Sequence, residues 1–163
     1  MTEVYVSIGS NVDREKYIKA GVSALRALYS NIICSPVYEN PAIGFEGDDF
    51  LNLVVRFTTD NTVTQVDAAL SKIEDENQRD RSAARFSPRT LDLDLLLFDD
   101  LMVQDDGLTL PRPEIYQQAF VLKPLADIAG NRIDPKTGQT FGQLWQEFTA
   151  NKPSKLTEIP FTY

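Results

Sequence analysis

The chain of 163 residues contains no histidine and only one cysteine, Cys34. The lack of histidine excludes a Ser-His-Asp triad, a histidine general base and a zinc site with histidine ligands. A single thiol cannot form a disulfide within the chain, which fits a reducing compartment. Ile32 and Ile33 precede Cys34 and indicate a thiol buried in a strand rather than a catalytic one.

Basic residues are few, with 16 lysines and arginines against 24 acidic residues and a formal net charge of −8. An acidic surface repels the phosphate backbone, which disfavours a nucleic-acid partner. No hydrophobic run approaches the length of a membrane span, and the N-terminal MTEVYVSIGS lacks the features of a signal peptide. We therefore expect a soluble, cytoplasmic monomer without a membrane partner.

Hydrophobic spacing predicts strands and helices in alternation over the first two thirds of the chain. The predicted strands cover 4–8, 32–38, 51–59 and 91–98, and the predicted helices cover 13–30, capped by Asp13, and 62–77. This strand-helix-strand-strand-helix-strand order predicts an α+β fold, an antiparallel sheet with two helices on one face.

The last third of the chain is rich in turns. It predicts helices near 114–118 and 141–148, a strand or helix at 120–128, and an irregular tail after Lys152. No linker or repeat divides the sequence, so we expect a single domain over 1–163 with C-terminal additions to the sheet.

Two aspartates in the last strand of the series are the sharpest chemical signal. Asp92 and Asp94 are two positions apart and therefore point to the same face of the sheet, with Leu91, Leu93 and Leu95 in the core behind them. Neighbouring carboxylates repel each other, and Mg²⁺ prefers one or two carboxylates completed by water and phosphate oxygens. The alternative is a pair of solvated surface aspartates.

Four of the nine arginines stand shortly before this pair, within a segment, 78–89, that is mostly loop: Arg79, Arg81, Arg85 and Arg89. Guanidinium groups match phosphate oxygens and keep their charge. Arginines beside a carboxylate pair favour phosphoryl transfer, in which a metal bridges phosphate oxygens. The alternative is a solvated loop that pairs with surface acids.

Aromatic and amide side chains suggest a pocket for a flat heterocycle. Phe50 and Asn52 share one strand face, and Phe120 follows the late helix. Two aromatic rings can sandwich a planar ring, and an amide both donates and accepts hydrogen bonds at its edge. Taken singly, Phe50 and Phe120 are more often core residues.

Together these segments resemble the 6-hydroxymethyl-7,8-dihydropterin pyrophosphokinase family of folate biosynthesis. The resemblance covers nearly the whole chain, and PRTLDLD at 88–94 is its most specific part. It rests on 8–11 (IGSN), 40–41 (NP), 50–52 (FLN), 88–94, 110–111 (LP) and 120–125 (FVLKPL).

The resemblance implies a ferredoxin-like βαββαβ fold and transfer of pyrophosphate from ATP to the pterin hydroxymethyl oxygen, leaving AMP. It implies two Mg²⁺ ions on Asp92 and Asp94, and it gives catalytic roles to these aspartates with Arg81 and Arg89. The implied ATP-binding residues are Glu74, Arg79, Arg81, Arg89, Leu95, Thr109, Arg112 and Gln118. The implied pterin-binding residues are Asn40, Pro41, Ile43, Phe50, Asn52, Phe86 and Phe120.

Two positions depart from the family pattern. Arg112 stands where the family usually has histidine, and Gln118 stands where it usually has arginine. Arg112 can still supply a cation to a phosphate, whereas Gln118 cannot. The sequence thus leaves open an alternative, a pterin-binding paralogue with weak or no kinase activity and a carrier or regulatory role. A third possibility, a ferredoxin-like interaction domain with no small-molecule site, such as an RNA binder, is disfavoured by the negative charge.

Overall fold

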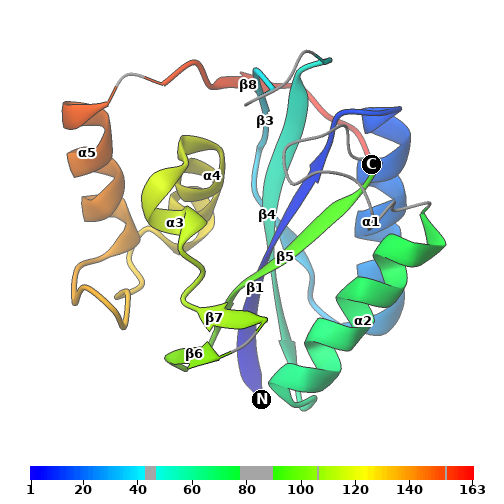
Figure 1. The fold of residues 1–163 in the computed structure, drawn as a ribbon, viewed down its shortest axis with the longest axis horizontal. Coiled ribbons are helices and arrows are strands. Elements are labelled where there is room, and N and C mark those ends of the chain that lie inside the picture. Colours follow the sequence, from blue (N-terminus) through cyan, green and yellow to red (C-terminus); the bar gives the residue numbers. More distant parts are fainter. Residues whose placement is uncertain (43–46, 78–89, 106, 153) are drawn as a thin grey trace.

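A computed structural model of the protein describes residues 1–42, 47–77, 90–105, 107–152 and 154–163 (Figure 1). Ile43 and the segment 78–89, which carries Arg79, Arg81, Phe86 and Arg89, lie outside the described residues.

The main sheet is antiparallel throughout, with strands in the order β5-β1-β4-β3-β8 and a short strand, β2, paired with β4. The strands of this sheet are β1 (Thr2–Ser10), β2 (Ile33–Cys34), β3 (Val37–Asn40), β4 (Phe50–Thr59), β5 (Asp92–Phe98) and β8 (Thr157–Ile159). A separate hairpin joins β6 (Val103–Asp105) to β7 (Leu108–Leu110).

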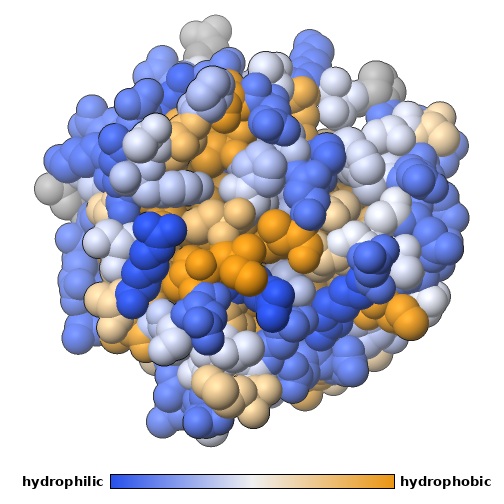
Figure 2. All heavy atoms as spheres, turned by 180° about the vertical axis from the view of Figure 1, so that it is seen from behind, coloured by the Kyte–Doolittle hydropathy of each residue, from blue (hydrophilic) through white to orange (hydrophobic). Residues whose placement is uncertain are grey.

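Helices cover both faces of the sheet, as Figure 1 shows. On one face α1 (Arg14–Leu28) and α2 (Val63–Glu76) enclose the larger core cluster, which includes Ile18 and Leu53. On the other face α3 (Glu114–Gln117) and α4 (Ala119–Ala129) enclose a second cluster around Val54, and α5 (Phe141–Asn151) packs against α4. Figure 2 shows a largely hydrophilic surface around a small apolar area, in line with the composition.

Most predicted elements are confirmed. Helix α2, for example, lies within one residue of the predicted helix 62–77 at each end, and a capping box fixes its start. Thr62 and Gln65 form a capping box, in which Thr62 Oγ1 accepts from the Gln65 N–H at 3.2 Å and Gln65 Oε1 accepts from the Thr62 N–H at 2.8 Å. Asp13 is the N-cap residue of α1, as predicted, and its backbone is left-handed with φ 43°. Its side chain makes no capping hydrogen bond, so it does not stabilise the helix in the way a capping aspartate usually does.

The predicted strand at 32–38 is interrupted at Ser35-Pro36, so β2 and β3 are separate. Pro36 has no N–H for a ladder. Ser35 still bonds to Val54 twice, because its N–H donates to the Val54 carbonyl at 2.9 Å and its Oγ accepts from the Val54 N–H at 2.9 Å. Cys34 is half-buried rather than fully buried, and burial raises the pKa of its thiol.

The C-terminal third departs most from expectation. The segment at 120–128 is helical, as one of its two predicted alternatives had it. The tail predicted to be irregular contains β8, which extends the sheet along β3, and the β6–β7 hairpin was not predicted. Of the helices in the described ranges, none combines the length and hydrophobicity needed to cross a bilayer.

Candidate active site

The register of the sheet places Asp92, Gly9 and Asn52 in one row. Gly9 of β1 lies opposite Asp92 of β5 on one side and opposite Asn52 of β4 on the other. Residues directly opposite each other point to the same face, and two strand spacings separate Asp92 and Asn52 by about 10 Å. Because Gly9 has no side chain, a carboxylate and an amide face a common space over the middle of the row.

The two aspartates of β5 lie on the same face, with the leucines behind them, as the sequence predicted. Asp92 and Asp94 are half-buried, whereas Leu91, Leu93 and Leu95 belong to the core cluster on the α1–α2 face. The aspartates therefore point to the opposite face, the one that carries α3 and α4.

Arg112 joins this pair from the segment that leads into α3. Its Nη2 lies 3.2 Å from Asp94 Oδ1, and its Nε lies 2.8 Å from Glu114 Oε2. Its backbone N–H donates to the Leu96 carbonyl at 3.0 Å, which fixes the base of the side chain against β5. Arg112, which stands where the family usually has histidine, thus lies at the carboxylate pair, a contact that the sequence did not predict.

The negative charge of the Asp94 carboxylate is unfavourable in its surroundings. Burial, then the charge of Asp92, raises the pKa of Asp94 to about 7, although Arg112 lowers it. The charges of Glu74 and Glu114 also raise the pKa of Asp94, to a smaller extent. A site with this excess of negative charge is suited to a cation.

Glu74 lies behind the strand rather than on the face of the aspartates. It is 6% exposed, and its Oε2 accepts from the Leu93 N–H at 2.9 Å. Among the described residues β5 is the edge strand of the sheet, and this bond satisfies a donor on its outer side. Glu74 therefore ties α2 to the strand between the two aspartates.

The donor set fits a divalent cation that a bound nucleotide completes. Within the part of the chain that the structure describes, no group of three or more His, Cys, Asp or Glu residues forms a metal site. Two carboxylates are nevertheless what Mg²⁺ uses when phosphate oxygens and water fill the remaining positions. The high pKa of Asp94 is consistent with such a site.

Leu95 and Thr109 are two further residues that the resemblance assigns to ATP. Leu95 has its side chain in the core at 2% exposure, so only its backbone can face a ligand. Thr109 lies in β7 opposite Gln104 and is half-buried.

A cavity of about 320 Å³ brings together four of the residues assigned by resemblance, Asn40, Pro41, Gln118 and Phe120. Asn52 Nδ2 donates to Asn40 Oδ1, and Phe50 lies opposite Asn40 in the β3–β4 register, so both adjoin this cavity without lining it. The other lining residues are Gln117, Ala119, Phe148, Lys152, Ser154, Lys155 and Leu156.

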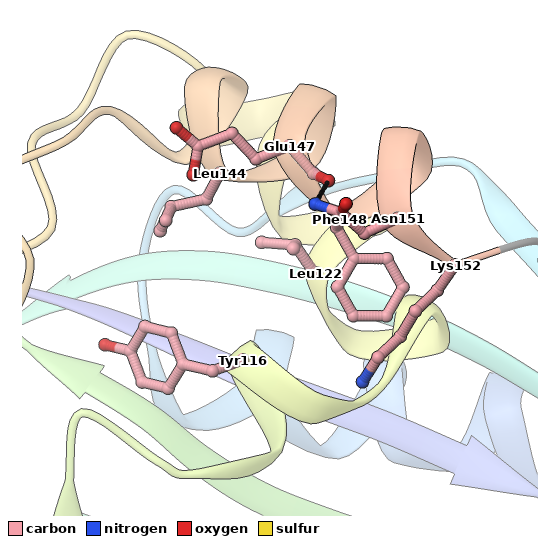
Figure 3. Close-up of a pocket in the computed structure, with 7 residues that line it drawn as sticks. All are labelled: Tyr116, Leu122, Leu144, Glu147, Phe148, Asn151 and Lys152. Atoms are coloured by element: carbon pink, nitrogen blue, oxygen red, sulfur yellow. Dashed lines mark hydrogen bonds between the residues drawn. The ribbon is translucent and has the colours of Figure 1, made fainter.

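Sequence reasoning missed the wall of this cavity that α5 and the following segment provide. Phe148 and Lys152 belong to it, and Lys152 Nζ lies 5.4 Å from the centre of the Phe148 ring. Both also line a neighbouring cavity of about 240 Å³ between α4 and α5, with Leu122 and Tyr116 opposite (Figure 3). The aromatic residue at 148 was predicted only as part of a helix.

A sequence profile described as 7,8-dihydro-6-hydroxymethylpterin-pyrophosphokinase (HPPK) matches residues 5–130. The chain is similar to the 2-amino-4-hydroxy-6-hydroxymethyldihydropteridine pyrophosphokinase of Bacillus subtilis, with 37% identity over 151 residues, 88% of this chain and 90% of that protein. It is also similar to the enzyme of the same name from Haemophilus influenzae, with 29% identity over 96% of this chain and 99% of that protein.

Solved structures support the fold. A Plasmodium falciparum HPPK-DHPS crystallised with pterin and p-hydroxybenzoate superposes with a TM-score of 0.74 at 13% identity, over 92% of this chain. This chain spans 43% of the length of that protein. At this identity the likeness concerns the arrangement of strands and helices, which is a mixed α/β fold with an antiparallel sheet.

Proposed function

The chain belongs to the 7,8-dihydro-6-hydroxymethylpterin-pyrophosphokinase family, and we propose a role for each part of its site in the reaction of that family. It is a pyrophosphokinase of folate biosynthesis, with ATP as the co-substrate. The reaction moves pyrophosphate from ATP to the hydroxymethyl group of 6-hydroxymethyl-7,8-dihydropterin and leaves AMP. The names of the relatives give no support to the alternative of a carrier without kinase activity.

The row Asp92–Gly9–Asn52 is the observation that carries the assignment of roles. We assign the heterocycle to the Asn52 side of the row and the phosphate chain to the Asp92 side. The hydroxymethyl oxygen then lies between the two, next to the Asn52 amide oxygen that covers Gly9. Holding two reactants in this way is the main means by which a protein accelerates phosphoryl transfer.

On the pterin side, Asn52 is held for recognition by its hydrogen bond to Asn40. An amide fixed at its carbonyl or amino end presents a defined edge to a ring. Phe120 lines the cavity beside Asn40 and Pro41, and Phe50 lies on the neighbouring strand. We assign these two aromatic residues to the faces of the pterin, with Ile43 and Phe86, outside the described residues, as further contacts.

On the phosphate side, Asp92 and Asp94 would hold Mg²⁺, two ions in the family pattern. The metal would neutralise phosphate charge and orient the β- and γ-phosphoryl groups. Arg112 reaches Asp94 and can donate to a phosphate, with Glu114 fixing its Nε end. Arg79, Arg81 and Arg89 remain assigned to the phosphates, and Arg81 and Arg89 to catalysis, by resemblance. Glu74, Leu95, Thr109 and Gln118 complete the ATP assignment.

The order β5-β1-β4-β3 supports a ferredoxin-like arrangement, with β8 and the helices after β7 as C-terminal additions to a single domain over 1–163. The single cysteine supports a cytoplasmic location, and a monomer is the remaining expectation. Light scattering after size exclusion measures the oligomeric state directly.

An assay of AMP release tests the function. The protein is mixed with 6-hydroxymethyl-7,8-dihydropterin, ATP and MgCl₂, and AMP and the pterin diphosphate should form in equal amounts. Product should vanish with EDTA and in Asp92→Asn. Equal AMP release with and without the pterin would mean hydrolysis of ATP, which would contradict transfer to the hydroxymethyl oxygen.

A further inference from the structure

A polar bridge connects α4 to the strand beside the pterin side of the site. Tyr38 of β3 donates its hydroxyl hydrogen to Asp127 Oδ2, and Asp127 Oδ1 accepts from Lys123 Nζ at 2.6 Å. Burial, then this bond to Asp127, raises the pKa of Tyr38, which remains a neutral donor. Tyr38 is 4% exposed, so the bond is shielded from water on the strand side.

The bridge starts in the row that the site uses. Tyr38 lies opposite Asn52 in the β3–β4 register, and Asn52 in turn donates to Asn40, two residues along β3. The bridge ends on the helix that carries Phe120 over the cavity shared with Asn40. Helix and strand are thus bonded at Tyr38 and Asp127, and Asn40 and Phe120 line one cavity between them. Seven helical residues, about 10 Å, separate Phe120 from Asp127 along α4.

A proline weakens the hydrogen bonding in the first turns of α4. Pro124 lies inside the helix and has no N–H, so the carbonyl of Phe120 lacks its usual helical donor. Lys123 precedes the proline and Asp127 follows it, so their ion pair spans the weakened part of the helix. Tyr38 then fixes Asp127 to the sheet.

We propose that Tyr38 and Asp127 are positioning residues that set the distance between Phe120 and the strands carrying Asn40 and Asn52. The bridge thereby sets the affinity of the pocket for a flat ring. The ion pair of Lys123 with Asp127, which spans Pro124, stabilises the bridge. This proposal rests on the proposed function, because it concerns the pocket assigned to the pterin.

The chain offers a matched control. Tyr116 of α3 also donates to a carboxylate, Asp134 Oδ1, at 2.9 Å, and Asp134 is fully buried. This second tyrosine–aspartate bond ties α3 to the turn before α5 and does not join α4 to the sheet. Tyr116 lines the cavity between α4 and α5 (Figure 3) and has no role in the assigned site.

The test compares Tyr38→Phe with Tyr116→Phe in steady-state assays with each substrate varied in turn. Tyr38→Phe should raise KM for the pterin about five- to tenfold and leave KM for ATP unchanged. Asp127→Ala should do the same, and the double variant should be no worse than either alone, since both changes remove one bridge. Tyr116→Phe should leave both KM values unchanged and lower only the melting temperature.

Trp145 provides a second readout. It is the only tryptophan of the chain, and Lys123 Nζ lies 5.8 Å from its ring centre. Its fluorescence should change when the pterin binds to the wild type, and this change should shrink in Tyr38→Phe. If Tyr38→Phe loses stability as Tyr116→Phe does but keeps its pterin KM and its fluorescence response, the bridge is only a structural tie. A wild type that binds no pterin would instead refute the proposed function.

Discussion

The side chain of Asn52 covers Gly9 in the middle of the sheet, so that a Cβ atom at residue 9 would lie only 2.7 Å from Asn52 Oδ1. Gly9→Ala should therefore displace the Asn52 side chain from its bond to Asn40 and weaken pterin binding about tenfold, or ~1.4 kcal/mol. Titration calorimetry with the pterin measures this loss.

Gly21→Ala is the matched control, since its Cβ would meet the Leu91 side chain at 3.1 Å in the core instead. It should change the melting temperature without changing pterin affinity. Equal affinity losses in the two variants would show that strain in the core, and not displacement of Asn52, weakens pterin binding.

The bond from the Leu93 N–H to Glu74 makes a prediction about stability. Glu74→Leu leaves a buried donor without its partner, which costs about 1–3 kcal/mol, or roughly 2–10 °C in melting temperature. Glu74→Gln retains a side-chain acceptor and should recover most of this loss. Thermal denaturation followed by circular dichroism distinguishes the two. A leucine variant as stable as the wild type would mean that Leu93 has another acceptor.

Tyr5 makes the stability of the protein sensitive to alkaline pH. Burial, then a hydrogen bond to Glu3, raises the pKa of Tyr5 to about 12, so the folded chain keeps a proton that the unfolded chain loses near pH 10. The folded state binds more protons between pH 10 and 12, and the free energy of unfolding must fall as pH rises through this window.

Tyr5→Phe should flatten that slope and, below pH 10, cost about 1 kcal/mol through the lost bond to Glu3. Urea denaturation of both proteins at pH 8, 10 and 11.5 provides the comparison. Parallel profiles would show that other groups cause the alkaline loss.

The aspartate pair could be predicted from the sequence because its geometry is local. A strand period of two fixes which side chains share a face, and the leucines between Asp92 and Asp94 identify the buried face. The same is true of α2, whose capping box and apolar spacing lie within one segment.

The rest of the site depends on contacts between distant segments. Strand periodicity places Gly9, Asn52 and Asp92 on faces of their own strands, but only the register puts them in one row. Similarly, no local pattern links Arg112 to Asp94, or Phe148 of α5 to the cavity beside Asn40. Strand β8 has three residues and, within the described part of the chain, pairs with β3 alone, so its formation depends on the sheet edge more than on its own sequence.

We expect the Asp94 carboxylate to lower the stability of the metal-free protein and yet to be required for activity. Its carboxylate is half-buried next to Asp92, so Asp94→Asn should stabilise the metal-free protein at pH 8 by about 1 kcal/mol, or 2–4 °C, after allowance for partial exposure. The same variant should lose AMP formation, because it removes an expected metal ligand. Differential scanning fluorimetry in EDTA, beside the AMP assay, tests both signs. A lower melting temperature would show that the ion pair with Arg112 outweighs the repulsion.

Gln118 tests whether the phosphate side of this chain lacks a cation. Gln118→Arg should lower KM for ATP about tenfold, or ~1.4 kcal/mol, if the side chain reaches the phosphates. Gln118 is also the N-cap of α4, where a positive charge opposes the helix dipole, so the melting temperature should fall by about 1–3 °C. Gln117→Arg places the same charge on the exposed neighbour and should leave KM for ATP unchanged. An unchanged KM in Gln118→Arg, with a raised KM for the pterin, would instead place residue 118 on the pterin side, beside Asn40 and Pro41.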